Sequence, residues 1–124
     1  MRPARDLAYS EPETRVKPKI LVVDDDRSVL GALKRYLSEN GFVCVVSDSG
    51  SEALMLVRES KPDIILVDAQ MPGLDGHAVC RVLKQEAVTQ TIPVIIMSGA
   101  LIEEQHVLAG FASGADDYVA KPFS

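Results

Sequence analysis

The chain has 124 residues, a length that suits one domain and is too short for two. Hydrophobic residues make up 47% and charged residues 25%, the usual mix of a folded globular protein rather than of a disordered chain. The net charge of −5 argues against direct binding of nucleic acid, because phosphate backbones attract clustered Lys and Arg. No apolar run approaches the ~20 residues of a membrane span, so we expect a cytoplasmic domain without membrane contact.

Residues 1–18 hold three prolines and mixed charges with little hydrophobic periodicity. Such a segment is typical of a flexible leader or linker. The domain proper is therefore expected to cover residues 19–124.

Short apolar runs rich in β-branched residues predict five strands. Their nearly continuous apolar character indicates strands that are buried on both faces, as in a parallel sheet between two helix layers. The predicted strands are Ile20–Val23, Phe42–Val46, Ile64–Val67, Val94–Met97 and Tyr118–Ala120.

Apolar residues at helical spacing predict a helix between each pair of strands. The first three helices centre on Val29–Leu37, Ala53–Val57 and Ala78–Leu83, and the fourth is expected at residues 103–113. Gly41 suits a left-handed end of the first helix, Lys61-Pro62 should end the second, and Gly114 should stop the fourth. The alternation predicts an α/β fold, a doubly wound parallel sheet in a three-layer sandwich.

Polar and charged residues follow four of the predicted strands. They are Asp24, Asp25 and Asp26 after the first strand, Asp68 after the third, Ser98 after the fourth, and Lys121-Pro122 after the fifth. Because ligands of such sheets bind beyond the carboxyl ends of the strands, these residues should meet at one edge. Crowded carboxylates favour a bound cation, and oxygen ligands without His or Cys suit Mg²⁺ better than Ca²⁺.

A carboxylate, a divalent ion, a hydroxyl and a lysine in one crevice make a phosphoryl-transfer site. Asp68 is the best candidate for its nucleophile. Each residue alone has a simpler interpretation, since Asp26 suits a helix N-cap and a lone Asp68 before a turn suits a structural role. The prediction therefore depends on the occurrence of all of them at successive strand ends.

At these residues the sequence resembles the receiver domains of two-component response regulators. The resemblance covers Lys19 to Phe123. The matching segments are Val22-Val23-Asp24-Asp25, Asp68-Ala69-Gln70-Met71-Pro72-Gly73-Leu74-Asp75-Gly76, Ser98-Gly99-Ala100, and Gly114-Ala115-Asp116-Asp117-Tyr118-Val119-Ala120-Lys121-Pro122-Phe123. The resemblance implies a flavodoxin-like sheet with strand order 2-1-3-4-5.

The resemblance also implies the chemistry of the site. Asp68 would accept a phosphoryl group from a phosphohistidine of a sensor histidine kinase or a phosphotransfer protein. Mg²⁺ would be bound by Asp25, Asp68 and the backbone carbonyl of Gln70, with Asp24 acting through water. Lys121 would pair with a phosphate oxygen. The domain would be regulatory rather than an enzyme, at most catalysing its own phosphorylation and dephosphorylation.

By the same resemblance, phosphorylation would be read out through two switch residues. The Ser98 hydroxyl would move to hydrogen-bond the phosphate, and Tyr118 would swing inward behind it, which would alter the surface around the fourth helix and the fifth strand. The Lys121-Pro122 bond is a candidate for cis. An output domain attached in a longer protein is a further expectation.

The sequence departs from the family at its end. Family members continue after the Lys-Pro-Phe motif into a fifth helix, whereas this sequence stops at Ser124. We therefore expect a fragment of a longer regulator or hybrid kinase. That helix would cover the sheet face beside the first helix, so apolar surface should be exposed there.

Three other functions are alternatives to a switch. A receiver that passes its phosphoryl group onward in a relay cannot be separated from a switch by sequence. A phosphatase with an aspartyl-phosphate intermediate commonly has a second acid two residues after the nucleophile, where this chain has Gln70. A receiver that serves only as an interaction module would be expected to lack the acidic pair, the phosphoacceptor or the lysine.

The histidines and three of the glycines have structural rather than ligand-binding interpretations. His77 and His106 have no paired ligands, so they are expected to be solvated or partly packed rather than metal ligands. Gly73, Gly76 and Gly99 are expected to serve tight turns, since the sequence contains no nucleotide-binding glycine motif.

Overall fold

The computed structural model describes residues 17–99 and 112–121, in which strands and helices alternate. The elements are β1 (Lys19–Val23), α2 (Arg27–Glu39), β2 (Val43–Ser47), α3 (Gly50–Ser60), β3 (Ile64–Asp68), α4 (Gly76–Gln85), β4 (Val94–Ser98) and β5 (Asp117–Ala120). The strands pair in parallel in the order β2-β1-β3-β4-β5. The predicted α/β class and strand order are therefore confirmed.

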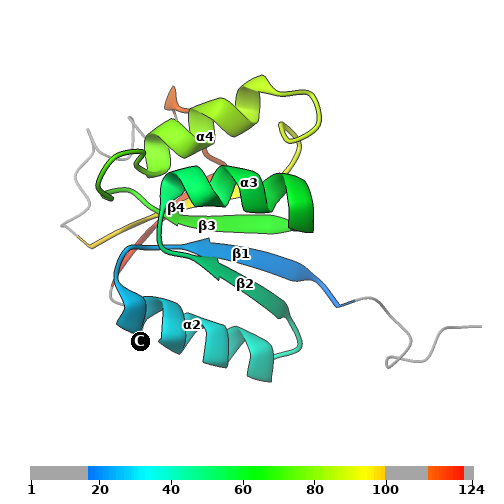
Figure 1. Ribbon diagram of the computed structural model, residues 1–124, viewed down its shortest axis with the longest axis vertical. Helices are drawn as coiled ribbons and strands as arrows, with labels where there is room; N and C mark the ends of the chain where they lie inside the picture. The colour runs from blue at the N-terminus through cyan, green and yellow to red at the C-terminus, as the bar shows by residue number, and fades with distance from the viewer. Residues whose placement is uncertain (1–16, 100–111, 122–124) are drawn as a thin grey trace, which may run out of the picture.

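The sheet lies between two helix layers. Helix α2 covers one face, and α3 and α4 cover the other (Figure 1). In β1, Leu21 and Val23 pack into the cluster on the α3 and α4 side, while Ile20 and Val22 pack into the cluster on the α2 side. Successive side chains of a strand point to opposite faces, so a strand covered on both faces needs an unbroken apolar run.

Strand β2 begins one residue later than predicted, at Val43 rather than Phe42. The backbone N–H of Phe42 donates to the carbonyl of Leu37, and that of Gly41 donates to Ser38. With Gly41 at φ 91°, these bonds form the Schellman ending of α2. Phe42 therefore belongs to the end of the helix, and β2 extends instead to Ser47.

Each of the other four strands differs from prediction by one residue at one end, and β1 begins at Lys19 rather than Ile20. Asp68 and Ser98 are the last residues of β3 and β4 rather than the first residues after them, and Asp117 opens β5. At the start of the sheet, Pro18 accepts a hydrogen bond of 2.8 Å from the N–H of Val43. The sheet's hydrogen bonding thus reaches one residue into the segment that was expected to be a leader.

Asp26, Lys61 and Gly114 lie at helix ends as the sequence predicts. The carboxylate of Asp26 accepts hydrogen bonds from the N–H groups of Ser28 and Val29, which confirms Asp26 as the N-cap of α2. Lys61 ends α3 in the left-handed conformation, directly before Pro62. Gly114 has φ 98°, as expected for the end of the fourth predicted helix, whose residues 103–111 lie outside the described part of the chain, as does Pro122.

The three described helices contain 13, 11 and 10 residues. None of the helices in residues 17–99 and 112–121 is long and apolar enough to cross a membrane.

Candidate functional site

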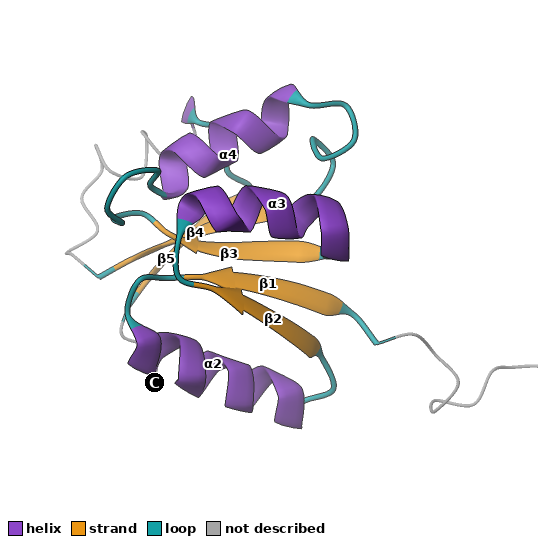
Figure 2. Cartoon of the chain, viewed as in Figure 1, coloured by secondary structure: helices purple, strands orange, loops and turns teal. Residues whose placement is uncertain are grey.

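Three carboxylates meet where β1 and β3 end. Asp24, Asp25 and Asp68 each offer an oxygen atom, and these oxygens lie within 4.8 Å of one another. Asp24 and Asp68 are buried, whereas Asp25 is exposed to solvent. Figure 2 shows β1 and β3 running toward the same edge of the sheet, which is why residues distant in sequence converge there. An all-oxygen site open on one side fits a hard cation such as Mg²⁺.

Lys121 reaches this cluster from the end of β5. Its Nζ lies 2.7 Å from Oδ2 of Asp24 and 3.6 Å from Oδ1 of Asp68. Its backbone N–H donates to the carbonyl of Ser98 across 2.6 Å, which ties the end of β5 to the end of β4. The predicted convergence of the acidic residues and the lysine is therefore present in the structure.

The electrostatics of the cluster favour a cation. Burial raises the pKa of Asp68, and the neighbouring charge of Asp24 raises it further, against the opposing effects of Lys121 and of a backbone hydrogen bond from Gln70. Burial by itself lowers the pKa of Lys121, but its contacts with Asp24 and Asp68 outweigh this and leave that pKa raised. A second positive charge near Asp68 would stabilise its ionised form.

Asp24 has a structural role that sequence reasoning missed. Its Oδ1 accepts a hydrogen bond of 2.9 Å from the N–H of Asp26, and its Oδ2 accepts one from Lys121. Asp24 therefore fixes the turn into α2 and also holds the lysine. No local pattern could reveal the second contact, since the two residues are 97 positions apart.

Gly76 packs directly against the backbone of Asp68. A Cβ atom on Gly76 would overlap the carbonyl oxygen of Asp68 and lie 2.9 Å from its carbonyl carbon. The expectation that Gly76 serves a tight turn is therefore wrong, because Gly76 is the first residue of α4 and its missing side chain lets the helix approach β3. Gly73, with φ 77°, has the left-handed conformation expected of a turn.

The predicted switch residues lie on the two strands beyond β3. Ser98 is buried at the end of β4, where it is paired in register with Ala120. Tyr118 on β5 is half-buried, packs against the cluster on the α3 and α4 side, and has its ring centroid 6.5 Å from that of His77. His77 is half-buried, in agreement with the expected partly packed histidine.

Two of the hollows in the described part of the chain have volumes of about 830 Å³ and 730 Å³. A groove of about 830 Å³ lies between α2 and the sheet, with Leu33, Leu66 and Val119 in its lining and Lys121 beside them. The side chains of Leu33, Leu66 and Val119 are partly exposed in this groove. The expectation that a fifth helix would cover this face stays a prediction.

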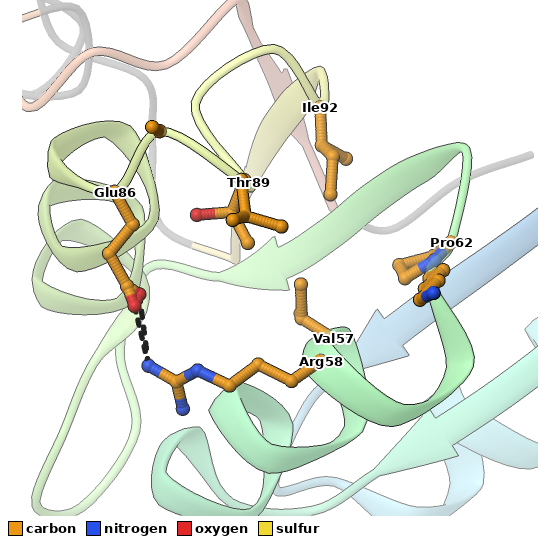
Figure 3. A pocket seen from close by; sticks show the side chains of 9 residues that line it. Val57, Arg58, Pro62, Glu86, Thr89 and Ile92 are labelled. Carbon is orange, nitrogen blue, oxygen red and sulfur yellow. Dashed lines mark hydrogen bonds and ion pairs between the residues drawn. The ribbon is translucent and has the colours of Figure 1, made fainter.

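A pocket of about 730 Å³ lies between the end of α3 and residues 86–92 (Figure 3). Arg58 and Glu86 form an ion pair of 2.7 Å at its rim. Its other lining residues include Pro62 and Ile92, which precede β3 and β4. The pocket is thus at the opposite edge of the sheet from the acidic cluster.

Comparison with known families identifies one match over most of the chain. Residues 20–124 match the family profile described as the response regulator receiver domain. A DNA-binding response regulator, MtrA of Mycolicibacterium smegmatis, is 43% identical over 108 residues, which cover 87% of this chain and 46% of MtrA. The chain therefore spans about half the length of this relative.

Solved structures agree with the sequence comparison. The receiver domain of the Francisella response regulator 1452 superposes with a TM-score of 0.79 at 40% identity, covering 86% of each chain. A two-component response regulator from Clostridium difficile superposes with a TM-score of 0.79 at 30% identity, covering 87% of this chain and 86% of the other.

Proposed function

Because this chain belongs to the response regulator receiver domain family of two-component signalling, we propose that it is a phosphorylation-dependent switch with Asp68 as its phosphoacceptor. The observation that carries the proposal is the cluster of Asp24, Asp25, Asp68 and Lys121 at one edge of the sheet. Two-component phosphotransfer requires a carboxylate nucleophile with nearby positive charge, and this cluster provides both.

In the proposed reaction Asp68 is the nucleophile. A carboxylate oxygen of Asp68 attacks the phosphorus of a phosphohistidine on the donor protein, the P–N bond breaks, and the imidazole leaves as the O–P bond of an acyl phosphate forms. Lys121, 3.6 Å from Asp68, is close enough to pair with an oxygen of the transferred group. The tie from its backbone to Ser98 keeps the lysine at this edge.

The acidic cluster is proposed to hold Mg²⁺. Asp25, Asp68 and the backbone carbonyl of Gln70 are the proposed direct ligands, with Asp24 acting through water. The ion would neutralise charge on the phosphoryl group during transfer. The raised pKa of Asp68 supports this assignment, since a carboxyl that ionises reluctantly gains from a cation beside it.

The readout is proposed to pass through Ser98 and Tyr118. The Ser98 hydroxyl would turn toward the phosphate on Asp68, and Tyr118 would pack inward behind it. Because β4 and β5 are paired from Ile95 to Ser98, a change at the end of β4 acts directly on the neighbouring strand. The surface around β5 and the segment before it would then present a changed shape to a partner.

The partners are proposed on the same grounds. The donor would be a sensor histidine kinase or a phosphotransfer protein in the cytoplasm, and a longer protein would carry an output domain beside this one. MtrA, whose length exceeds the matched region, is a DNA-binding response regulator. The net charge of −5 favours an output domain, rather than this chain, as the part that would contact DNA.

Phosphorylation by a small phosphodonor tests the proposal. The wild-type chain, incubated with acetyl phosphate and Mg²⁺, should gain the mass of one phosphoryl group, and Asp68→Asn should not. Asp63→Asn is the matched control, because Asp63 is an exposed aspartate that contacts the N–H of Lys19 at the start of β1. A wild-type chain without a Mg²⁺-dependent gain, or a gain that persists in Asp68→Asn, contradicts the proposal.

A further inference from the structure

His77 presents a buried nitrogen that the fold does not satisfy. It is the second residue of α4, and its Nε2 has no hydrogen-bond partner. Within residues 17–99 and 112–121, it is the only buried side-chain nitrogen or oxygen atom in this condition. Buried polar atoms are nearly always paired, because removing them from water without a partner is unfavourable. A conformation in which a nearby group forms a hydrogen bond with Nε2 of His77 would therefore be more stable.

Tyr118 is the neighbour that can supply the missing partner. Its ring centroid lies 6.5 Å from that of His77, and the two ring planes are tilted by 42°. The phenol hydroxyl both donates and accepts hydrogen bonds, so it can pair with Nε2 whether or not that nitrogen carries the proton. The hydroxyl and Nε2 both lie at the edges of their rings, so modest ring rotations can bring them to the ~2.8 Å of a hydrogen bond.

His77 and Tyr118 lie on elements that contact Asp68 in different ways. Helix α4 begins at Gly76, which packs without a side chain against the carbonyl of Asp68, so His77 is held at a fixed position beside the phosphoacceptor strand. Tyr118 lies on the edge strand β5, which pairs only with β4 among the described strands. Tyr118 is therefore separated from the strand of Asp68 by β4, whereas His77 lies on the helix that packs directly against that strand.

On the basis of the proposed function, we infer that His77 is a positioning residue of the switch: its Nε2 receives the Tyr118 hydroxyl and holds this ring inward in the phosphorylated state. Phosphorylation at Asp68 would draw β4 toward the phosphate and bring Tyr118 onto His77. The new hydrogen bond would satisfy the unpaired Nε2 only in that state. It would therefore shift the equilibrium between the two conformations toward the active one.

Imidazole NMR tests the hydrogen bond directly. The ¹⁵N resonance of Nε2 of His77, assigned by its loss in His77→Leu, is recorded with and without beryllofluoride and Mg²⁺, a mimic of the phosphoryl group. We expect this resonance to shift on activation in the wild-type chain and to stay unshifted in Tyr118→Phe, which lacks only the hydroxyl. An equal shift in both proteins, or no shift in either when beryllofluoride is bound, overturns the inference.

Variants of His77 test its effect on the switch. His77→Leu should still gain the phosphoryl mass but should bind beryllofluoride about fivefold more weakly, since loss of one net hydrogen bond from the active state lowers its population by that factor. His77→Gln places an amide near Nε2 and should restore most of the affinity. Equal affinity of His77→Leu and wild type, or weakening in His77→Gln as large as in His77→Leu, contradicts the inference.

These measurements separate two kinds of failure. If the wild-type chain neither binds beryllofluoride nor gains the phosphoryl mass at Asp68, the proposed function itself is wrong. If binding and mass gain are normal but Nε2 of His77 does not respond to the Tyr118 hydroxyl, only the role of His77 is wrong.

Discussion

Lys121 donates a hydrogen bond from Nζ to Oδ2 of Asp24 across 2.7 Å, whereas its distance to Oδ1 of Asp68 is 3.6 Å. The side chain of Asp24 is fully buried and that of Lys121 is 15% exposed, so water screens this ion pair only slightly. Asp24 thus holds the lysine beside Asp68, the proposed phosphoacceptor. When Asp68 carries a phosphoryl group, the same Nζ is near enough to contact it.

Lys121→Met should destabilise the fold by about 3 kcal/mol, because it leaves the buried carboxylate of Asp24 without its cation. Urea denaturation measures this change in the free energy of unfolding. Arg27→Met is the matched control, since it removes an ion pair of 3.0 Å to Asp48 whose side chains are 83% and 45% exposed. The control should cost less than ~1 kcal/mol. Equal losses in the two variants would show that burial does not strengthen the pair with Asp24.

The fold, and the meeting of the acidic residues and the lysine at one edge of the sheet, could be predicted because both depend on short stretches of sequence. Strands buried on both faces need unbroken apolar runs, and polar residues that directly follow such runs must lie at one edge of a parallel sheet. Asp26 is likewise predictable, since an N-cap depends only on the next three residues. The joint placement of Asp68 and Lys121 follows from strand order.

Contacts between distant residues could not be predicted in the same way. The pairing of Lys121 with Asp24, the packing of Gly76 on the carbonyl of Asp68, and the approach of Tyr118 to His77 each join two different elements. Such contacts depend on how elements pack, and no spacing along the chain encodes them. The sequence therefore predicts a turn at Gly76, although the structure shows that a close approach between helix and strand requires this glycine.

The stability of the chain should depend on pH through Asp68. Burial and then the charge of Asp24 raise the pKa of this carboxyl above its ordinary value of 3.8, so the native state holds the proton more tightly than the unfolded state does. The resulting stabilisation is complete below pH 3.8 and is lost as the pH rises through the raised pKa. Asp68→Asn should remove this pH dependence and, at pH 7 with a chelator, be more stable than wild type by on the order of 1 kcal/mol. Urea denaturation from pH 4 to 8 measures both effects, and lower stability of Asp68→Asn at pH 7 would contradict the prediction.

Mg²⁺ should make the wild-type chain more stable than Asp68→Asn, which reverses the order expected with a chelator. A ligand that binds only the native state stabilises it by about 1.4 kcal/mol at ten times its dissociation constant. We expect Mg²⁺ to raise the melting temperature of the wild-type chain and to have little effect on Asp68→Asn. Asp63→Asn, with its exposed carboxylate at the other edge of the sheet, should respond as wild type does. An equal response of Asp68→Asn and wild type would place the ion elsewhere.

Lys84 joins α4 to the segment that leads into β5. Its Nζ donates to the carbonyl of Ile92 across 2.8 Å and lies 2.9 Å from Oδ2 of Asp116, which in turn accepts from the N–H of Val94. Lys84→Met should cost about 2 kcal/mol, since charged hydrogen bonds at a half-buried lysine are lost. Arg58→Met, which removes the more exposed pair with Glu86 drawn in Figure 3, should cost less than ~1 kcal/mol. A larger loss in Arg58→Met would contradict this ranking.

Gly76→Ala tests whether close packing of α4 positions Asp68, the proposed phosphoacceptor. The added Cβ would overlap the carbonyl group of Asp68, so the helix or the end of β3 must shift, at a cost of about 2 kcal/mol. Gly31→Ala is the matched control, because Gly31 lies within α2 and a Cβ there meets no atom within 4 Å. Alanine in that helix should stabilise the fold by about 0.5–1 kcal/mol.

Phosphorylation by acetyl phosphate should be slowed in Gly76→Ala and unchanged in Gly31→Ala, because only the first substitution displaces Asp68 from Lys121. A Gly76→Ala chain with wild-type stability and phosphorylation rate would show that α4 can move away without disturbing the site.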